Sequence, residues 1–290
     1  MVTPTNIETR ETLIWVSART DIGMKRASNE DSMLVADLAT GRATMGADMD
    51  MDVYEADGRG MLMAISDGMG GEAAGEVASH IAITVLHEAL LRQTDDLDIE
   101  ERLKMAVELA NIQVWTRAQA DSALTGMGTA LTAALVQGGS AYVAQIGHSR
   151  AYLIRDDMAR QITVDQTLAQ ALVDRGAINA YGTRSILKNI LTQAIGASPV
   201  VQAALISVEI CPDDHLLICS NGLSNKVASN EISLVIQQSA NLTDACGRLI
   251  EIANERGGED NITVMLARMS GAAHSLPIAG GNTGRLKLVA

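Results

Sequence analysis

Helical patterns in this chain come in two adjacent pairs, with strand-like stretches before, between and after them. In the first pair, apolar residues recur at helical spacing over 72–91 and again over 99–120. The second pair covers 230–238 and 243–255. Because each pair of helices follows several strands rather than one, the order excludes a regular repeat of strand, helix and parallel strand.

Short apolar runs bounded by turn residues predict the strands around these helices. They cover 13–17, 32–36, 61–66, 129–136, 141–146, 203–210, 215–220 and 261–269. A short helix is expected at 168–175, and the acidic stretch 37–60 is expected to be a surface loop or a loose hairpin. This order of elements predicts an α+β chain with a mainly antiparallel sheet system.

Composition limits the core and the partners. Hydrophobic residues make up 47% of the 290 residues, and Phe is absent, so aliphatic side chains and 14 Met must fill a sizeable core. The formal net charge of −13 argues against nucleic acid or an anionic membrane as the main partner, because both attract basic surfaces. The same charge is compatible with divalent cations, although most of it is expected to be an ordinary soluble surface.

Several features favour a cytoplasmic protein. The first residues are polar and lack the apolar centre of a signal peptide, and no apolar run has the roughly 18 residues of a membrane helix. Three cysteines without metal-ligand spacing fit a reducing compartment. We expect one domain over 13–269, an extension over 1–12 and a flexible tail over 270–290.

Acidic or amide residues stand where four predicted strands begin or end. Asp67 and Asn221 follow strands, whereas Glu30, Asp31 and Asp260 precede strands. In an antiparallel sheet the end of one strand lies beside the start of its neighbour, so these residues should gather at one edge. Clustered carboxylates repel one another unless cations neutralise them. Oxygen ligands suit hard ions such as Mg²⁺ or Mn²⁺.

Glycines crowd the segment that follows Asp67. Gly68 would leave a backbone carbonyl accessible to an ion, and Gly70 and Gly71 give the freedom that a tight turn needs. An ordinary Asp-Gly turn accounts for the same residues without a metal.

Seven stretches, taken in order, resemble the metal-dependent protein serine/threonine phosphatases of the protein phosphatase 2C type, particularly the compact bacterial ones. The stretches are TDIGMKRASNEDS (20–32), SDGMGGEAAGEVAS (66–79), GMGTAL (126–131), IGHSRAYLIR (146–155), TVDQT (163–167), LLICSNGLSN (216–225) and GGEDNITVML (257–266). The resemblance covers roughly 15–269. It implies a four-layer α-β-β-α sandwich of two mainly antiparallel sheets flanked by helix pairs, with a flap-like segment at about 168–198.

The resemblance also implies a catalytic centre with two Mn²⁺ or Mg²⁺ ions. Asp67 and Asp260 would be the catalytic carboxylates. Asp67 would bridge the ions, and Gly68 would offer its carbonyl to one of them. Asp260 and Asn221 would complete the shell of the other ion.

Three further residues receive roles from the same resemblance. Glu30 and Asp31 would act on the second ion, directly or through water. Arg26 would bind the substrate phosphate, to which a guanidinium is well suited. The substrate would be a phosphorylated protein, and a serine/threonine kinase or its targets would be the partners.

Three positions depart from the family pattern, in which aspartate is usual. They are Asn221 and Asn225 in the stretch SNGLSN, and His148 in the stretch GHSR. Asn221 can still ligate through its amide oxygen, but one site of the ion pair should be weakened, and a more weakly held third ion should be lost. For His148, a hydrogen-bonded residue at the edge of the site is expected; the alternative is a ligand for a softer ion.

Two functions follow. The first is hydrolysis of phosphoserine and phosphothreonine in proteins by a metal-activated water, with weakened or altered metal dependence. The alternative is a catalytically impaired pseudophosphatase that acts as a phosphoprotein-binding or regulatory module. The retained Arg26, Asp67 and Asp260 favour the first, and the two Asn residues favour the second.

Overall fold

The structure is a computed structural model. It describes residues 13–46, 48–56, 58–70, 72–93, 96–179, 185–270 and 287–289. The predicted N-terminal extension lies outside these residues, as does most of the predicted tail.

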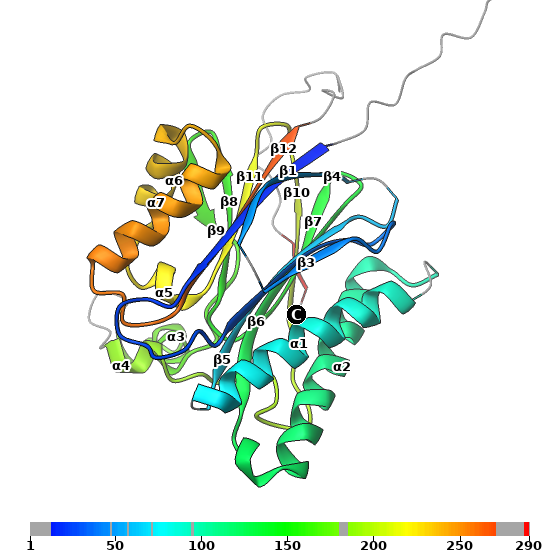
Figure 1. Cartoon of the computed structure of the whole chain (residues 1–290), viewed down its shortest axis with the longest axis vertical. Helices are drawn as coiled ribbons and strands as arrows, with labels where there is room; N and C mark the ends of the chain where they lie inside the picture. Colours follow the sequence, from blue (N-terminus) through cyan, green and yellow to red (C-terminus); the bar gives the residue numbers. More distant parts are fainter. Residues whose placement is uncertain are drawn as a thin grey trace, which may run out of the picture.

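Two antiparallel sheets stack face to face in the described part of the chain (Figure 1). The six-stranded sheet contains β1 (Leu13–Asp21), β4 (Met49–Glu55), β8 (Arg150–Arg155), β9 (Met158–Gln161), β11 (His215–Cys219) and β12 (Ile262–Ser270). The seven-stranded sheet contains β2 (Asp31–Asp37), β3 (Ala43–Met45), β5 (Met61–Met69), β6 (Gly128–Gln137), β7 (Ser140–Ile146), β10 (Ala204–Glu209) and β13 (Lys287–Val289). Their strand orders are β4-β1-β12-β11-β8-β9 and β13-β10-β7-β6-β5-β2-β3.

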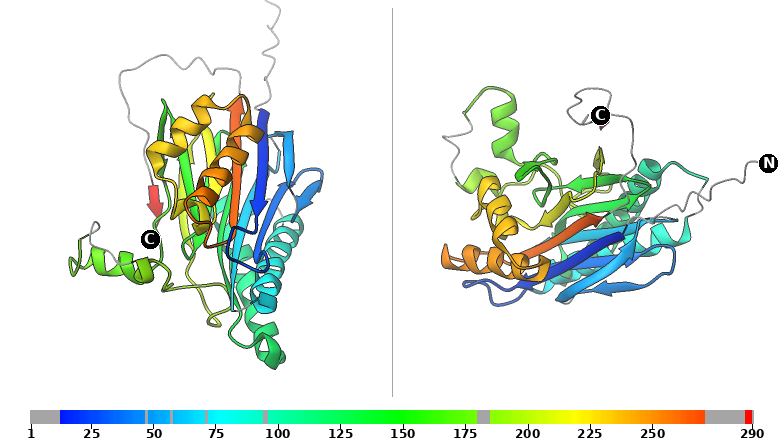
Figure 2. Two further views of the ribbon diagram at one scale, coloured as in Figure 1. Left: turned by 60° about the vertical axis from the view of Figure 1, so that its left-hand side comes forward. Right: turned by 90° about the horizontal axis from the view of Figure 1, so that it is seen from above.

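A pair of helices covers the outer face of each sheet (Figure 1 and Figure 2). The seven-stranded sheet carries α1 (Glu72–Arg92) and α2 (Ile99–Ala120). The six-stranded sheet carries α6 (Ser229–Gln238) and α7 (Leu242–Glu255). The expected four-layer α-β-β-α sandwich is therefore confirmed.

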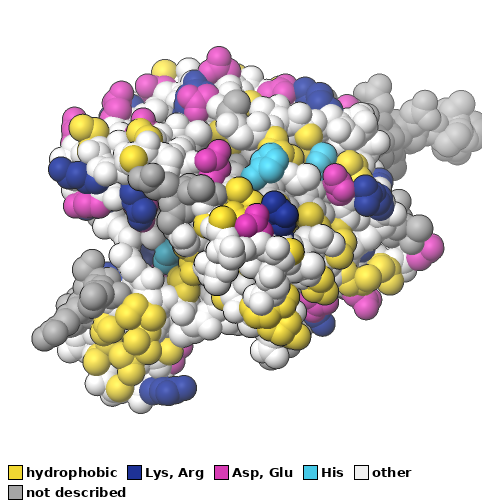
Figure 3. All heavy atoms as spheres, turned by 60° about the horizontal axis from the view of Figure 1, so that its bottom comes forward, with side chains coloured by type: hydrophobic (Ala, Val, Ile, Leu, Met, Phe, Trp, Pro, Cys, Tyr) yellow, Lys and Arg dark blue, Asp and Glu magenta, His cyan; other side chains and the backbone are white. Residues whose placement is uncertain are grey.

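The remaining helices are short. They are η1 (Ser122–Leu124), α3 (Leu168–Asp174), α4 (Ser185–Lys188) and α5 (Asn221–Ser224). The α3–α4 segment, within the predicted flap, stands out from the body of the molecule, and Figure 3 shows hydrophobic side chains gathered on it at lower left. Residues 180–184 between these two helices lie outside the described part.

Strand β5 shows why its sequence is continuously apolar rather than alternating. Leu62 and Ala64 face the helices α1 and α2. Met61, Met63 and Ile65 face the layer between the two sheets. Because both faces of the strand are buried, every position from Met61 to Ile65 is apolar, and the buried Ser66, which hydrogen-bonds Thr129, comes before Asp67.

The stretch 37–60 was expected to be a loop or a loose hairpin, and this expectation is wrong. Its two strands, β3 and β4, belong to different sheets: β3 pairs with β2, and β4 pairs with β1. The stretch therefore connects the edges of the two sheets. The hairpin of β8 and β9 was also not anticipated.

The predicted tail is described at only a few positions beyond the last strand of the core. Residues Lys287–Val289 form β13, which pairs with β10 in antiparallel fashion. Within the described residues, no helix has the length and apolar character needed to cross a bilayer.

Candidate metal centre

The layer between the two sheets ends in polar side chains. On β2 and β5, Met33 lies opposite Ile65 in the apolar core, and two residues further Asp31 lies opposite Asp67. Successive residues of a strand alternate between faces, so both carboxylates point into the same layer as the core residues before them. The register thus brings together two acidic residues that are far apart in the sequence.

Burial makes Asp31 an unfavourable place for a charge. Its pKa lies well above the usual value of 3.8, first because burial removes water from the carboxylate and next because Asp67 repels it. Thr263 on β12 donates from Oγ1 to Asp31 Oδ2 at 2.6 Å, which partly opposes this rise. The contact joins the two sheets at the site.

Asp67 is under the same constraint. Burial raises its pKa to about 7, and the charge of Asp260 adds to the rise. The Asn221 backbone amide and the Arg26 guanidinium lower this pKa, but less than the other two effects raise it. A nearby divalent cation would stabilise the ionised carboxylates and reverse the balance.

Asp260 and Arg26 form an ion pair at the rim. Arg26 Nη2 lies 2.7 Å from Asp260 Oδ1, and the side chains are 46% and 27% exposed. Arg26, which is expected to bind the substrate phosphate, thus contacts Asp260, which is expected to bind a metal ion. The Arg26 guanidinium is accessible to solvent. Its charge lowers the pKa of Asp67, which indicates that it lies close to this carboxylate.

Two glycines let helix α1 pack against the end of β5. A Cβ at Gly68 would overlap the carbonyl oxygens of Gly75 and Glu30, and a Cβ at Gly75 would overlap the Glu30 carboxylate. The Gly68 amide donates to the Glu30 carbonyl at 3.2 Å. Close packing therefore explains these glycines without a metal, in addition to the role that the sequence predicted for Gly68.

Asn261 fixes the loop that carries Glu30. Its Oδ1 accepts from the Glu30 amide at 2.9 Å, and its Nδ2 donates to the carbonyls of Ile22 and Ser28, each at 2.9 Å. The sequence reasoning assigned no role to Asn261 or to Thr263. Both stand in the stretch GGEDNITVML directly after Asp260, so the motif held the signal, although their partners depend on the fold.

Asn221 and His148 close the other side of the site. Asn221 begins α5, directly after β11, and His148 lies in the turn between β7 and β8. Asn221 Nδ2 lies 2.9 Å from His148 Nε2. His148 Nδ1 lies 3.9 Å from Asp67 Oδ2. Burial lowers the pKa of His148, which favours the neutral ring.

The oxygen atoms at this site suit a divalent ion, although the carboxylates do not all gather around one point. Among the described residues, no three His, Cys, Asp or Glu side chains gather closely enough to hold a metal by themselves. However, Asp67 Oδ2 and Asn221 Oδ1 are buried oxygens without a hydrogen-bond partner. Such atoms cost stability unless something binds them, and a cation supplies that partner.

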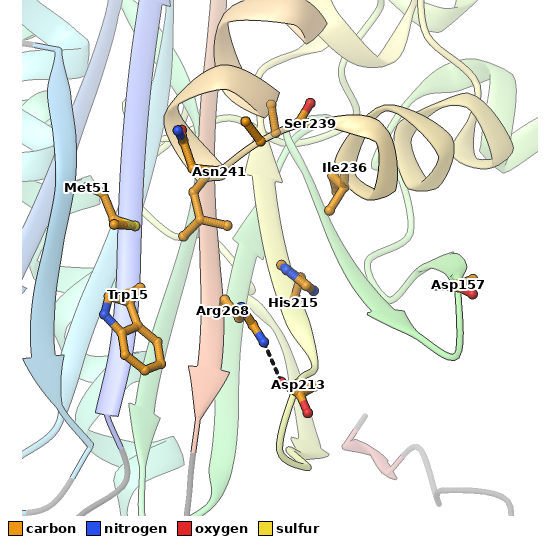
Figure 4. Close-up of a pocket in the computed structure, with 12 residues that line it drawn as sticks. Trp15, Met51, Asp157, Asp213, His215, Ile236, Ser239, Asn241 and Arg268 are labelled. Atoms are coloured by element: carbon orange, nitrogen blue, oxygen red, sulfur yellow. Dashed lines mark hydrogen bonds and ion pairs between the residues drawn. The ribbon is translucent and has the colours of Figure 1, made fainter.

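A separate groove lies at the opposite end of the six-stranded sheet (Figure 4). It has a volume of about 620 Å³, and its floor includes Trp15, Arg268 and His215, which lie in one row across β1, β12 and β11. Arg268 is paired with Asp213. His215 is at the start of β11, whereas Asn221 of the candidate centre follows the end of that strand, so the groove is not part of the centre.

The comparisons with known proteins agree with this geometry. The family model described as protein phosphatase 2C matches residues 50–267. A serine/threonine phosphatase stp of Listeria innocua is 33% identical over 252 residues, which is 86% of this chain and 93% of that protein. Serine/threonine protein phosphatase PstP of Mycobacterium tuberculosis is 37% identical over 87% of this chain and 44% of its own length.

Solved structures give the same result. The catalytic domain of serine/threonine protein phosphatase PstP in complex with two manganese ions superposes with a TM-score of 0.73. The match has 33% identity and covers 89% of this chain and 99% of that one. The sequence and the fold agree over almost the whole described chain, and this chain belongs to the protein phosphatase 2C family.

Proposed function

We propose that this protein hydrolyses phosphoserine and phosphothreonine in proteins, with a divalent metal centre at the end of β5. One observation carries the proposal. Asp31 and Asp67 lie opposite each other in neighbouring strands, and desolvation raises the pKa of each carboxyl. In a family of phosphatases, a pair of carboxylates that resists ionisation indicates a place for cations.

The chain's own residues would hold the ions and the substrate. Asp67, Asp260 and Asn221 offer side-chain oxygens, and Gly68 offers a carbonyl. A bound Mn²⁺ or Mg²⁺ supplies a water of lowered pKa and neutralises charge on the phosphoryl oxygens.

Thr263, Asp31 and Glu30 would support and orient these ligands. Thr263 donates to Asp31 and holds that carboxylate at the junction of the two sheets. Glu30 would act on an ion directly or through water.

Arg26 would exchange its partner during binding. Its pair with Asp260 at 2.7 Å leaves the side chain 46% exposed, within reach of an incoming phosphate. If an ion takes the Asp260 carboxylate, the guanidinium loses its partner and becomes available for the phosphate oxygens. Metal binding would thus prepare the substrate site.

Cysteine chemistry offers no competing mechanism. Burial raises the pKa of the Cys219 and Cys246 thiols to about 12, so neither is a thiolate near neutral pH. Burial also raises the pKa of Cys211. A water nucleophile is therefore the more reasonable choice.

The proposal is tested by phosphate release from a phosphothreonine peptide and from an aryl phosphate, across Mn²⁺ and Mg²⁺ titrations. Wild type, Asp67→Asn and Asn221→Asp are compared, with Asp50→Asn as the control, because the Asp50 side chain is 85% exposed. We expect metal-dependent activity in wild type and in the control, and its loss in Asp67→Asn. Asn221→Asp should need less metal, because it adds a negative ligand.

Two outcomes would overturn the proposal. If wild type is silent at every concentration of both ions while Asn221→Asp is active, the chain is a pseudophosphatase whose site has lost one essential charge. Wild-type activity that survives Asp67→Asn would instead place the chemistry elsewhere.

A further inference from the structure

Three buried polar atoms near the end of β5 have no hydrogen-bond partner. They are Asp67 Oδ2, His148 Nδ1 and Asn221 Oδ1. His148 is 9% exposed and Asn221 is 6% exposed. A buried polar atom without a partner is destabilising, so three in one place indicate that this site receives a ligand.

The imidazole of His148 is held at one nitrogen and open at the other. Nε2 lies 2.9 Å from Asn221 Nδ2, which fixes the direction of the ring. Nδ1 then faces Asp67, at 3.9 Å from Oδ2. Two donors that bind one ion at about 2.1 Å, at right or tetrahedral angles, are about 3.0 to 3.4 Å apart. A shift of less than about 1 Å brings this pair to that separation.

We propose that His148 Nδ1 is a direct ligand of a divalent transition-metal ion that it shares with Asp67. The metal centre of this chain then contains a nitrogen donor among its oxygens. The inference rests on the proposed function, because it concerns the same centre. It goes further by assigning a ligand and a preference among ions.

The contact with Asn221 explains how the ring becomes a ligand. When Asn221 Nδ2 donates to Nε2, the neutral ring carries its proton on Nδ1, and the Asn221 oxygen is free for an ion. When the amide turns over, its oxygen accepts from Nε2–H, and Nδ1 presents a lone pair to the metal. Metal-binding histidines are usually oriented in this way by an acceptor at the second nitrogen.

The two arrangements suit different ions. Mg²⁺ prefers oxygen and would use the Asn221 amide oxygen, with His148 as its support. Zn²⁺ and Co²⁺ accept imidazole readily, and they would use His148, with Asn221 as the support. The pair formed by His148 and Asn221 therefore determines which ions the centre prefers.

A purely structural role for His148 makes a different prediction. In that case the ring serves only to hold Asn221, and a side chain of similar reach with an amide would replace it. His148→Gln is therefore the informative variant. His215→Gln is a matched control, because His215 is another partly buried histidine, at the far end of the six-stranded sheet.

The experiment uses the full chain stripped of metal with EDTA. Co²⁺ is titrated while its visible absorption is recorded, and Zn²⁺ and Mg²⁺ affinities are measured by competition and calorimetry. We expect His148→Gln to bind Co²⁺ and Zn²⁺ at least tenfold more weakly and to change the Co²⁺ spectrum. Its Mg²⁺ affinity should change less than about threefold, and His215→Gln should match wild type.

A second measurement needs no variant. In protein labelled with ¹⁵N-histidine, Zn²⁺ should shift the Nδ1 resonance of one histidine, whereas Mg²⁺ should leave that resonance near its metal-free position. An unchanged Co²⁺ spectrum and affinity in His148→Gln, or an equal loss for all ions, would show that His148 is structural.

The two proposals fail in different ways. If His148 is structural, wild type still hydrolyses the phosphopeptide with Mn²⁺, and the proposed function stands. If wild type is inactive with every ion but the Co²⁺ spectrum depends on His148, the phosphatase proposal fails and the ligand assignment stands.

Discussion

Replacing Asp67 with Asn should stabilise the metal-free protein at alkaline pH while abolishing its metal-dependent activity. Asn has nearly the same shape as Asp and carries no charge. The folded chain buries this carboxyl beside Asp31 and near Asp260, and its pKa rises to about 7. Removing the charge therefore removes a cost that the folded, metal-free chain bears.

The size of the effect follows from the pKa. Below its usual value of 3.8, Asp67 is protonated in both the folded and unfolded chains, so it has no destabilising effect. As the pH rises to about 7, only the unfolded chain releases the proton, and folding stability falls by about 1.4 kcal/mol per pH unit. The full cost at pH 8 is on the order of 4 kcal/mol, and at pH 5 it is on the order of 1.5 kcal/mol.

The assay is unfolding by heat or urea after treatment with EDTA, at pH 5 and pH 8. For a chain of this size, 1 kcal/mol corresponds to about 2 °C, so Asp67→Asn should melt several degrees higher than wild type at pH 8. The gain at pH 5 should be less than half as large. Asp50→Asn should melt within about 1 °C of wild type at both pH values, because Asp50 is largely exposed and its ion pair with Arg19 contributes little. Mn²⁺ should stabilise wild type and leave Asp67→Asn unchanged.

Two results would contradict this prediction. A gain of equal size at pH 5 and pH 8 would mean that the charge of Asp67 is not its cause. A lower melting temperature of Asp67→Asn at pH 8 would mean that the ionised carboxylate is satisfied within the folded chain without a metal.

Three further changes test other parts of the structure. Gly68→Ala should lower stability by about 2 kcal/mol or more in a urea titration, because the new Cβ overlaps the Gly75 carbonyl oxygen; unchanged stability would show that α1 moves freely. Asp214→Ala should lower the free energy of unfolding by about 2 to 3 kcal/mol in the same assay. The Asp214 side chain is 2% exposed, and Arg155 Nη2 lies 2.6 Å from its Oδ2. A loss below about 0.5 kcal/mol would contradict the effect expected of a buried ion pair. Arg26→Ala should lower kcat/KM for a phosphothreonine peptide about ten- to hundredfold without weakening Mn²⁺ binding, because Arg26 competes with a metal ion for Asp260, and an unchanged kcat/KM would exclude Arg26 from phosphate binding.

The sequence predicted the architecture best where a helix has a distinct apolar side or a strand is apolar over most of its length. Helices α6 and α7 show the first pattern, and β5, which is buried on both faces, shows the second. Strand β4 was missed although its Met-Asp alternation is typical of a strand. A bulge in the pairing of β4 with Val16 and Ala18 interrupts the alternation of buried and exposed residues along β4. Met49 and Tyr54 are therefore buried, whereas Met51 is exposed.

The hairpin of β8 and β9 was missed for a different reason. Its turn consists of Asp156 and Asp157, whose φ values are 48° and 62°. This conformation is usual for Asn-Gly or Asp-Gly, and two aspartates give a weak signal of it. Turn chemistry was therefore a less reliable guide than the apolar residues of the strands.

For the site, strand ends predicted which residues come together but not how they pair. The opposition of Asp31 and Asp67 follows from the antiparallel register. The pair of Arg26 and Asp260, and the contact of His148 with Asn221, depend on side-chain positions across two sheets. No pattern within a single segment of sequence contains that information.

The most direct test of the metal centre is the anomalous scattering of manganese in crystals grown with saturating Mn²⁺. We expect an anomalous peak within about 2.5 Å of a carboxylate oxygen of Asp67. Arg26 should no longer contact Asp260 when a peak lies on the Asp260 carboxylate. A well-ordered crystal at saturating Mn²⁺ with no peak near Asp67 would contradict the claim that these buried oxygens form a divalent metal centre.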